Sequence, residues 1–408
     1  MDRADYPGFS TDAIHAGYEP DPYLGSINVP IYASTTFAQN APNDLRGGYE
    51  YGRVANPTVA TLERTVSALE QGEFGVAFAS GMAATDTVLR VLLRPGDHIV
   101  LGNDVYGGTW RLIDSVFQPW GIDYSVVDTT DVDAVAAEIA PHTRVIWLET
   151  PTNPMLSVSD IAAVAAVKGD AKLIVDNTFA SPYLQRPLEH GADVVVHSTT
   201  KYLGGHSDSI GGVVVTNDEA IDEQLRFLQG GVGAIVSPFE AYLVTRGIKT
   251  LSVRMERHCN NAEKVAHFLG KSDKVAKVYY PGLNTHETHG VAKRQMRRFG
   301  GMVSVAFHTE DDAVAFCQAT KLICLAESLG GVESLIEHPA SMTHQSATGS
   351  QTEVPREVVR ISVGIEDVAD LQADLEAGLE CAARVAAGRG VPSSSTVRSS
   401  VSISAWPM

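Results

Sequence analysis

The apolar positions of the chain fall into short runs with little polar alternation. Six such runs, rich in Val, Ile and Leu, lie at 98–101, 124–127, 144–149, 172–176, 193–197 and 212–215. Strands buried on both faces of a parallel sheet have this composition, and the connecting segments are long enough for crossover helices. Those predicted helical segments are 107–118, 131–139 and 158–168. The pattern therefore predicts an α/β fold with a mainly parallel sheet.

The pattern changes on both sides of this predicted sheet. Residues 1–60 are rich in Gly, Pro and Asn without a sustained period, and we interpret them as an arm that wraps another surface. We expect a large domain at 61–255 and, where helices and strands follow in a new order, a smaller α+β domain at 256–388. The Ser-rich stretch 389–408 is predicted to be a flexible tail.

Charge and cysteine content exclude several classes. The 49 acidic and 31 basic residues give a net charge of -18 without a Lys/Arg run, which argues against nucleic-acid and anionic-membrane partners. No window approaches the ~20 apolar residues of a membrane span, and the start has no apolar leader, so we expect a cytoplasmic protein. Four cysteines follow no disulfide or zinc spacing, and we expect reduced thiols and no metal: Cys259, Cys317, Cys324 and Cys381.

Polar side chains gather where the predicted strands end. One strand ends in Asp176 and another leads into Ser198-Thr199-Thr200-Lys201, while Glu149 and His197 end two of the runs. A buried ammonium is costly unless it is paired or acts in its neutral form. Because ligands of open α/β sheets lie beyond the carboxyl ends of strands, these groups are expected to share one site.

The turn FASGMAAT (78–85) leads into a predicted helix, whose first backbone N–H groups suit an anion. An anion seat, a carboxylate and an amine are together what pyridoxal 5'-phosphate (PLP) requires. The groups proposed for the anion are Ser80, Gly81 and Met82, with Ser198 and Thr200 as hydroxyl donors. The combination predicts a PLP site.

Each group alone has a simpler explanation. Asp176 is suited to capping a turn, and Lys201 to a solvent-exposed strand end. The spacing of Ser198 and Lys201 also fits the SxxK motif of penicillin-binding enzymes, but the chain has no SDN or KTG partner. THETH (285–289) lacks HExxH spacing, so surface histidines are expected there, and no GxGxxG indicates a nicotinamide cofactor.

Longer motifs carry a resemblance to a known family. They include EYGR (50–53), SGMAAT (80–85), ETPTNP (149–154), VDNTFASPYLQRPLEHGADVVVHSTTKYLGGHSD (175–208) and VRISVG (359–364). With them the chain resembles the Cys/Met-metabolism family of PLP-dependent enzymes. The resemblance implies the PLP-dependent transferase fold type I, whose N-terminal arm contributes to the active site of a neighbouring subunit. It also implies a homotetramer, a dimer of dimers, that acts on small amino-acid substrates.

The resemblance also implies a role for individual residues. Lys201 is the Schiff-base lysine and catalytic base, and Asp176 pairs with the pyridine nitrogen. Tyr106 stacks on the ring and, with Tyr51, assists catalysis. The implied phosphate ligands are Gly81, Met82, Ser198 and Thr200, with Tyr51 and Arg53 of the neighbouring subunit. The implied ligands of the substrate α-carboxylate are Asn153, Ser328 and Arg360.

Three charged residues bear on which reaction is expected. Arg111, Glu50 and Glu327 resemble the groups that hold the far end of cystathionine, although Arg111 and Glu327 also suit a structural ion pair. Overall similarity favours the family's actinobacterial cystathionine γ-synthases, which join O-acetyl- or O-succinyl-L-homoserine to L-cysteine by γ-replacement in transsulfuration and methionine biosynthesis. The alternative is cystathionine γ-lyase, which Glu50 mildly favours. Methionine γ-lyase, which carries a cysteine at the position of Gly108, and O-acylhomoserine sulfhydrylase are less favoured.

Overall fold

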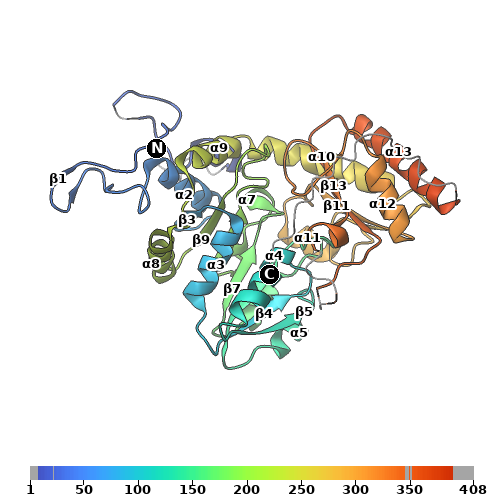
Figure 1. Cartoon of the computed structure of the whole chain (residues 1–408), viewed down its shortest axis with the longest axis horizontal. Coiled ribbons are helices and arrows are strands. Elements are labelled where there is room, and N and C mark those ends of the chain that lie inside the picture. Colours follow the sequence, from blue (N-terminus) through green and yellow to red (C-terminus); the bar gives the residue numbers. More distant parts are fainter. Residues whose placement is uncertain (1–7, 22, 345–348, 350–351, 389–408) are drawn as a thin grey trace, which may run out of the picture.

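The larger sheet of the protein is built from the predicted apolar runs. A computed structural model describes residues 8–21, 23–344, 349 and 352–388, so the predicted tail at 389–408 lies outside the described residues. The larger sheet has seven strands in the order β3-β9-β8-β7-β6-β4-β5 (Figure 1). They are β3 (Phe74–Phe78), β4 (His98–Gly102), β5 (Asp123–Val127), β6 (Thr143–Glu149), β7 (Lys172–Asp176), β8 (Val194–Ser198) and β9 (Gly212–Thr216). Only β9 runs antiparallel to its neighbours, so the predicted mainly parallel α/β sheet is confirmed.

One strand of this sheet was not predicted. In β3, a Cβ atom on Gly75 would lie 2.6 Å from the backbone oxygen of Glu63 in α2 (Pro57–Leu69). The strand therefore needs a glycine in its centre to pack against the helix, and this weakens the β-branched pattern by which strands are recognised.

Polar caps fix where the helices begin. Asn56 accepts hydrogen bonds from Thr58 N and Val59 N at the start of α2, and Ser80 accepts one from Ala83 N at the start of α3 (Gly81–Leu92). The predicted crossovers contain α4 (Gly107–Leu112) with a following π-helical turn (Ile113–Phe117), α5 (Val132–Ala137) and α6 (Ile161–Val167). The helices that follow are α7 (Ser181–Leu184), α8 (Glu219–Leu228), α9 (Pro238–Ile248), α10 (Leu251–Leu269) and α11 (His289–Gln295).

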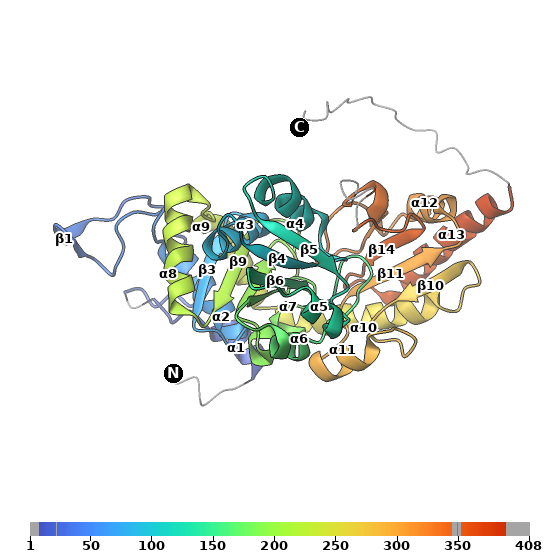
Figure 2. The ribbon, with the colours of Figure 1, turned by 90° about the horizontal axis from the view of Figure 1, so that it is seen from below.

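A second, smaller sheet follows α10. Its order is β10-β11-β14-β13-β12, with only β12 and β13 parallel. Its strands and the two helices packed with them are β10 (Val275–Tyr279), β11 (Met302–Phe307), α12 (Glu310–Ala319), β12 (Cys324–Leu325), β13 (Leu335–Glu337), β14 (Val358–Ser362) and α13 (Val368–Ala386). Figure 2 shows α12 and α13 beside β11 and β14, away from the larger sheet.

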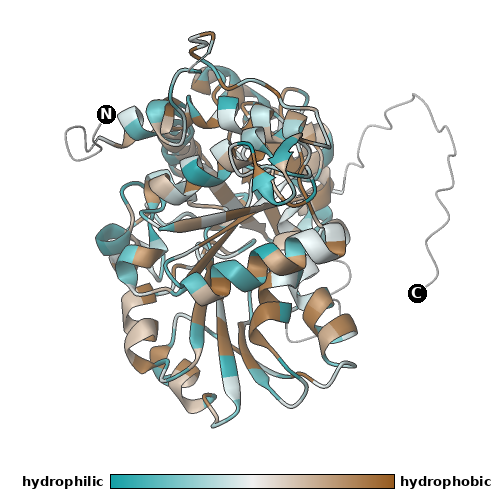
Figure 3. Ribbon diagram, turned by 90° about the vertical axis from the view of Figure 1, so that its left-hand side faces the viewer, coloured by the Kyte–Doolittle hydropathy of each residue, from teal (hydrophilic) through white to brown (hydrophobic). Residues whose placement is uncertain are grey.

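The two sheets share apolar packing. One buried cluster joins Phe9 in α1 (Phe9–His15), Val213 in β9, Met255 in α10 and Met302 in β11. Strands are apolar along most of their length, whereas the helices that cover them carry polar outer faces (Figure 3). Because this core spans the predicted boundary near residue 255, the division into domains stays a prediction.

Between α1 and α2 the N-terminal segment is mostly exposed, although α1 itself packs into the core. After α1, the segment contains a small hairpin formed by β1 (Gln39–Ala41) and β2 (Asp44–Leu45). This hairpin projects from the body of the protein in both views (Figures 1 and 2). Tyr23 and Leu24 are each 91% exposed. Apolar side chains left in water at this extent indicate a surface made to contact something else.

Three smaller expectations concern thiols, histidines and membranes. The four cysteines are unpaired in the structure. The surface location expected for His286 was wrong: its side chain is buried and contacts Thr288 Oγ1 at 3.2 Å, because the turn before α11 folds inward. Within the described ranges, no helix has the length and apolar character needed to cross a membrane.

Candidate active site

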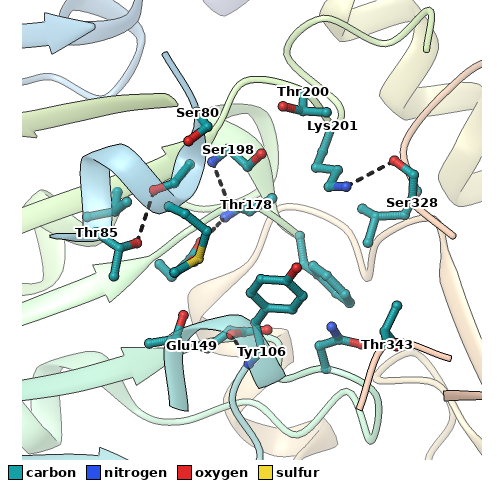
Figure 4. Close-up of a pocket in the computed structure, with 18 of the residues that line it drawn as sticks. Ser80, Thr85, Tyr106, Glu149, Thr178, Ser198, Thr200, Lys201, Ser328 and Thr343 are labelled. Atoms are coloured by element: carbon teal, nitrogen blue, oxygen red, sulfur yellow. Dashed lines mark hydrogen bonds between the residues drawn. The ribbon is translucent and has the colours of Figure 1, made fainter. Parts of the chain in front are cut away.

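A cavity of about 290 Å³ lies at the carboxyl ends of β6, β7 and β8, next to the first turn of α3 (Figure 4). Twelve of the residues that were given a role from the sequence line it: Ser80, Gly81, Met82, Tyr106, Asn153, Asp176, Ser198, Thr200, Lys201, Glu327, Ser328 and Arg360. Four do not line it: Glu50, Tyr51, Arg53 and Arg111. Residues more than 250 positions apart in the sequence are thus brought to one place by the two sheets.

One wall of the cavity suits a phosphate. Gly81 begins α3 so close to β8 that a Cβ atom on it would lie 2.9 Å from Ser198 Cβ. The first backbone N–H groups of a helix lack intrahelical partners, and the helix dipole favours an anion there. Ser198 and Thr200 line the same space (Figure 4), and Thr200 Oγ1 accepts the backbone N–H of Gly211 at 3.2 Å. Ser198 is oriented in turn by its backbone N–H, which donates to Thr178 Oγ1 at 2.9 Å.

Asp176 supplies a buried carboxylate at the end of β7. Its Oδ1 accepts the backbone N–H of Thr178 at 3.0 Å. Burial raises the pKa of Asp176, while hydrogen bonds from Thr178 and the charge of His197 oppose that rise. A carboxylate in this setting is stabilised when it gains a cationic partner, such as a protonated ring nitrogen.

Lys201, which follows β8, also lines the cavity. Its Nζ donates to Ser328 Oγ at 2.9 Å, and Figure 4 shows this bond at the edge of the cavity. Burial lowers the pKa of Lys201 to about 8, and the positive charge of Arg360 adds to this effect, against the charges of Glu337 and Glu327. A much larger share of the amine is therefore neutral near physiological pH than in an exposed lysine.

Arg360 of β14 lies buried beside the amine. Its Nη1 donates to Asn153 Oδ1 at 2.9 Å and its Nη2 to the backbone oxygen of Ser328 at 2.9 Å. Nη2 also lies 2.9 Å from Glu337 Oε2, an ion-pair contact without hydrogen-bond geometry. Within the described part of the chain, Arg360 Nε has no partner. A guanidinium that these contacts hold in a fixed position at the cavity is suited to an incoming carboxylate.

Sequence reasoning missed Glu337, the carboxylate behind Arg360. Glu337 lies in β13 directly opposite Arg360 in the antiparallel register, and both side chains are buried. Its Oε1 accepts the hydroxyl of Thr343 at 2.9 Å. The strand is only three residues long, so the sequence offers no local periodicity that predicts this pairing.

Glu149 was recognised as a strand end but was given no role. Its Oε2 accepts the backbone N–H of Tyr106 at 2.8 Å, which fixes the loop that carries this ring. Glu149 is paired with Asp176 across β6 and β7. Burial raises the pKa of Glu149 well above its usual range, and the adjacent charge of Asp176 raises it further. Burial and the adjacent carboxylate therefore both favour the neutral form of Glu149.

Glu149→Gln tests this protonation state. Glutamine is neutral and keeps an acceptor for the N–H of Tyr106, so we expect PLP affinity and stability close to those of the native protein. Glu149→Ala leaves that N–H without its acceptor and is expected to lose about 1–3 kcal/mol of unfolding free energy. Denaturant unfolding and titration with PLP measure both effects. Equal impairment of the two variants would show that the negative charge is required.

The four remaining residues lie outside the cavity. Arg53 donates through Nη1 to the backbone oxygen of Gly230, and its guanidinium carbon lies 5.5 Å from the ring centroid of Tyr51, which is 43% exposed. Arg111 is in the last turn of α4 and is close enough for its charge to lower the pKa of Tyr106 against the rise caused by burial. Glu50 is exposed on the arm.

Comparison with known proteins agrees with this geometry. A family model described as "Cys/Met metabolism PLP-dependent enzyme" matches residues 10–380. The chain belongs to this family. The residues of the cavity also fit PLP independently of this match, because they combine a seat for phosphate, a buried carboxylate and an amine of lowered pKa. PLP is the cofactor of this enzyme family.

Several family members are similar along nearly the whole chain. A cystathionine gamma-synthase of Mycobacterium tuberculosis is 59% identical over 376 residues, which are 91% of this chain and 97% of that protein. A cystathionine beta-lyase of Coxiella burnetii is 50% identical over 89% of this chain and 95% of its own. The crystal structure of metB from Corynebacterium glutamicum has a TM-score of 0.91 at 65% identity and covers 92% of this chain and 98% of its own.

Proposed function

We propose that this enzyme is a cystathionine γ-synthase, which replaces the acyloxy group at Cγ of an O-acyl-L-homoserine, released as a carboxylate, with the sulfur of L-cysteine. The observation that carries the proposal is the 59% identity to the M. tuberculosis cystathionine gamma-synthase over 376 residues. Lys201, Asp176 and Arg360 line one cavity, as such an enzyme requires. We further propose that the enzyme is cytoplasmic, where small amino-acid substrates of this kind are available.

The side chains of the cavity have different roles in the proposed reaction. PLP, when bound, withdraws electrons from the substrate Cα and so makes its hydrogen acidic. Lys201, with its pKa of about 8, has enough neutral amine to take that proton. Once Nζ has released this proton it can take another from Cβ, after which the Cγ–O bond breaks and the acyloxy group departs as a carboxylate. Arg360, which lines the cavity and is held in place by Asn153 and Glu337, binds the substrate α-carboxylate.

The mouth of the cavity is proposed to select the second substrate. Glu327 lines the cavity, and Arg111 and Glu327 both act electrostatically on Tyr106, so opposite charges lie around this ring. Cysteine carries one ammonium and one carboxylate, which such a pair complements. Tyr106 is placed to stack on the cofactor ring, because its backbone is fixed by Glu149 at the edge of the cavity.

The decisive experiment compares synthesis with cleavage. Purified enzyme is given L-cysteine with O-acetyl- or O-succinyl-L-homoserine, and separately L-cystathionine, and kcat/KM is measured for each. We expect cystathionine formation to be the faster reaction. A preference for cleavage would overturn the proposal, and the keto acid would then identify the reaction: 2-oxobutanoate for the γ-lyase alternative, pyruvate for a β-lyase.

We also propose that the active site is shared between subunits of a homotetramer. Tyr51 and Arg53 lie outside the cavity of their own chain, on an arm that projects from the body. The exposed apolar side chains of this arm, such as Leu24 and Ile27, gain burial if a second copy packs against it. In this arrangement Tyr51 and Arg53 reach the phosphate held by the neighbouring chain. We also propose domain limits at residues 60, 255 and 388.

A further inference from the structure

A guanidinium lies buried behind the turn that carries Lys201. Arg254 of α10 is 4% exposed, and its Nη1 donates to the backbone oxygen of Tyr202 at 2.8 Å. Its Nη2 donates to the backbone oxygens of Gly247 at 2.9 Å and Leu203 at 3.5 Å. Arg254 forms no ion pair with a carboxylate of the described residues, so backbone oxygens take the place of a counter-ion.

The position of this charge has a physical cost that its contacts offset. Burial lowers the pKa of Arg254 to about 10, so the group stays cationic at neutral pH. A buried cation without a carboxylate is unfavourable unless many hydrogen bonds compensate it. Gly247 lies in the last turn of α9, where helix carbonyls lack partners and the dipole favours a cation. The guanidinium therefore ties the end of α9 to the turn that follows Lys201.

Two glycines permit this close packing. A Cβ atom on Gly205, whose φ is +73°, would lie 2.2 Å from Arg254 Nη1. One on Gly247 would lie 2.2 Å from the backbone oxygen of Gly204. Side chains at these positions would push the guanidinium, the turn and α9 apart, so the local sequence is fitted to this contact.

We propose that Arg254 is a positioning residue for Lys201. Its planar fork holds the backbone oxygens of Tyr202 and Leu203 and thereby fixes where the Lys201 amine stands relative to Ser328 and the cavity. The inference rests on the catalytic role given to Lys201 in the proposed function. A lysine cannot replace this fork, because a single ammonium does not present donors in a rigid plane.

The test compares Arg254→Lys with Arg257→Lys. Both arginines are on α10, but Arg257 has a side chain that is 47% exposed and contacts Asp367 instead of the turn. In PLP-free full-length protein, acetylation of Lys201 is followed against pH by mass spectrometry, after unfolding curves show that each variant is folded. We expect a midpoint near 8 for the native protein and for Arg257→Lys.

For Arg254→Lys we expect this midpoint to rise by about one unit, because a loosened turn lets water reach the amine. In the holoenzyme, kcat at neutral pH should fall about tenfold and recover at higher pH, while KM, which depends on Arg360, changes less. A native midpoint and native pH profile in Arg254→Lys would overturn the proposal.

A second variant keeps the test valid if Arg254→Lys does not fold. Thr250→Val removes the hydroxyl that accepts a hydrogen bond from Arg254 Nε at 3.1 Å and donates to the backbone oxygen of Gly247 at 3.0 Å, and it leaves the charge in place. A rise of the labelling midpoint in this variant supports the proposal, and an unchanged midpoint contradicts it. The labelling needs no substrate, so it remains informative if the native enzyme fails to form cystathionine.

Discussion

Lys201→Ala is expected to lower kcat by about 10³-fold or more, since one change removes both the covalent attachment of the cofactor and the base. The variant should remain folded and hold PLP without a covalent bond, because the phosphate seat and Asp176 are untouched. Steady-state assays measure the loss, and borohydride treatment followed by mass spectrometry tests for covalent cofactor. Lys293→Ala, on the exposed side of α11, is the control. Retention of a large part of the activity would rule out the role of Lys201.

The same variant tests whether active sites are shared. If Arg53 serves the neighbouring subunit, Arg53→Ala and Lys201→Ala chains are each impaired alone. After they are unfolded and refolded together, a mixed dimer contains one site with both native residues, and activity should reappear. If Arg53 acted within its own chain, every mixed dimer would contain two damaged sites and activity would stay low.

Asp176→Ala is expected to weaken both PLP binding and turnover, by about 10²-fold or more in kcat/KM, because the ring nitrogen loses its buried acid partner. Titration of absorbance with PLP and steady-state kinetics measure the two effects, with Asp170→Ala at an exposed position as control. Burial raises the pKa of Asp176, so in PLP-free protein its carboxylate should protonate at higher pH than an exposed aspartate as pH falls. Unchanged kinetics would show that another group serves the nitrogen.

Local sequence patterns predicted the fold where a single segment carries the information. The six β-branched runs became strands because burial on both faces selects such residues wherever they occur. β3 and β13 escaped recognition for opposite reasons, one because Gly75 is required by a neighbouring helix and the other because three residues define no period. Both failures arise from contacts with parts of the chain distant in sequence.

The residues of the site also differ in how far the local sequence predicts them. Lys201 and Asp176 follow apolar strands directly, so the position of each could be predicted from its own neighbourhood. Glu149 and Glu337 act through strand register, which pairs them with Asp176 and Arg360 across the sheets. Arg254 lies 52 residues beyond Tyr202, whose backbone oxygen it binds. A charge that acts on a distant backbone leaves no local signature in the sequence.

The residues that line the cavity come from two sheets with different functions. The phosphate seat, Asp176 and Lys201 come from the larger sheet, whereas Ser328 and Arg360 come from the smaller one. Substitutions around the smaller sheet can therefore alter which amino acid is held, and for how long, while the phosphate seat and Asp176 stay unchanged. A few substitutions around the smaller sheet can therefore change which reaction the enzyme catalyses. The residues of the larger sheet that hold the cofactor need not change with them.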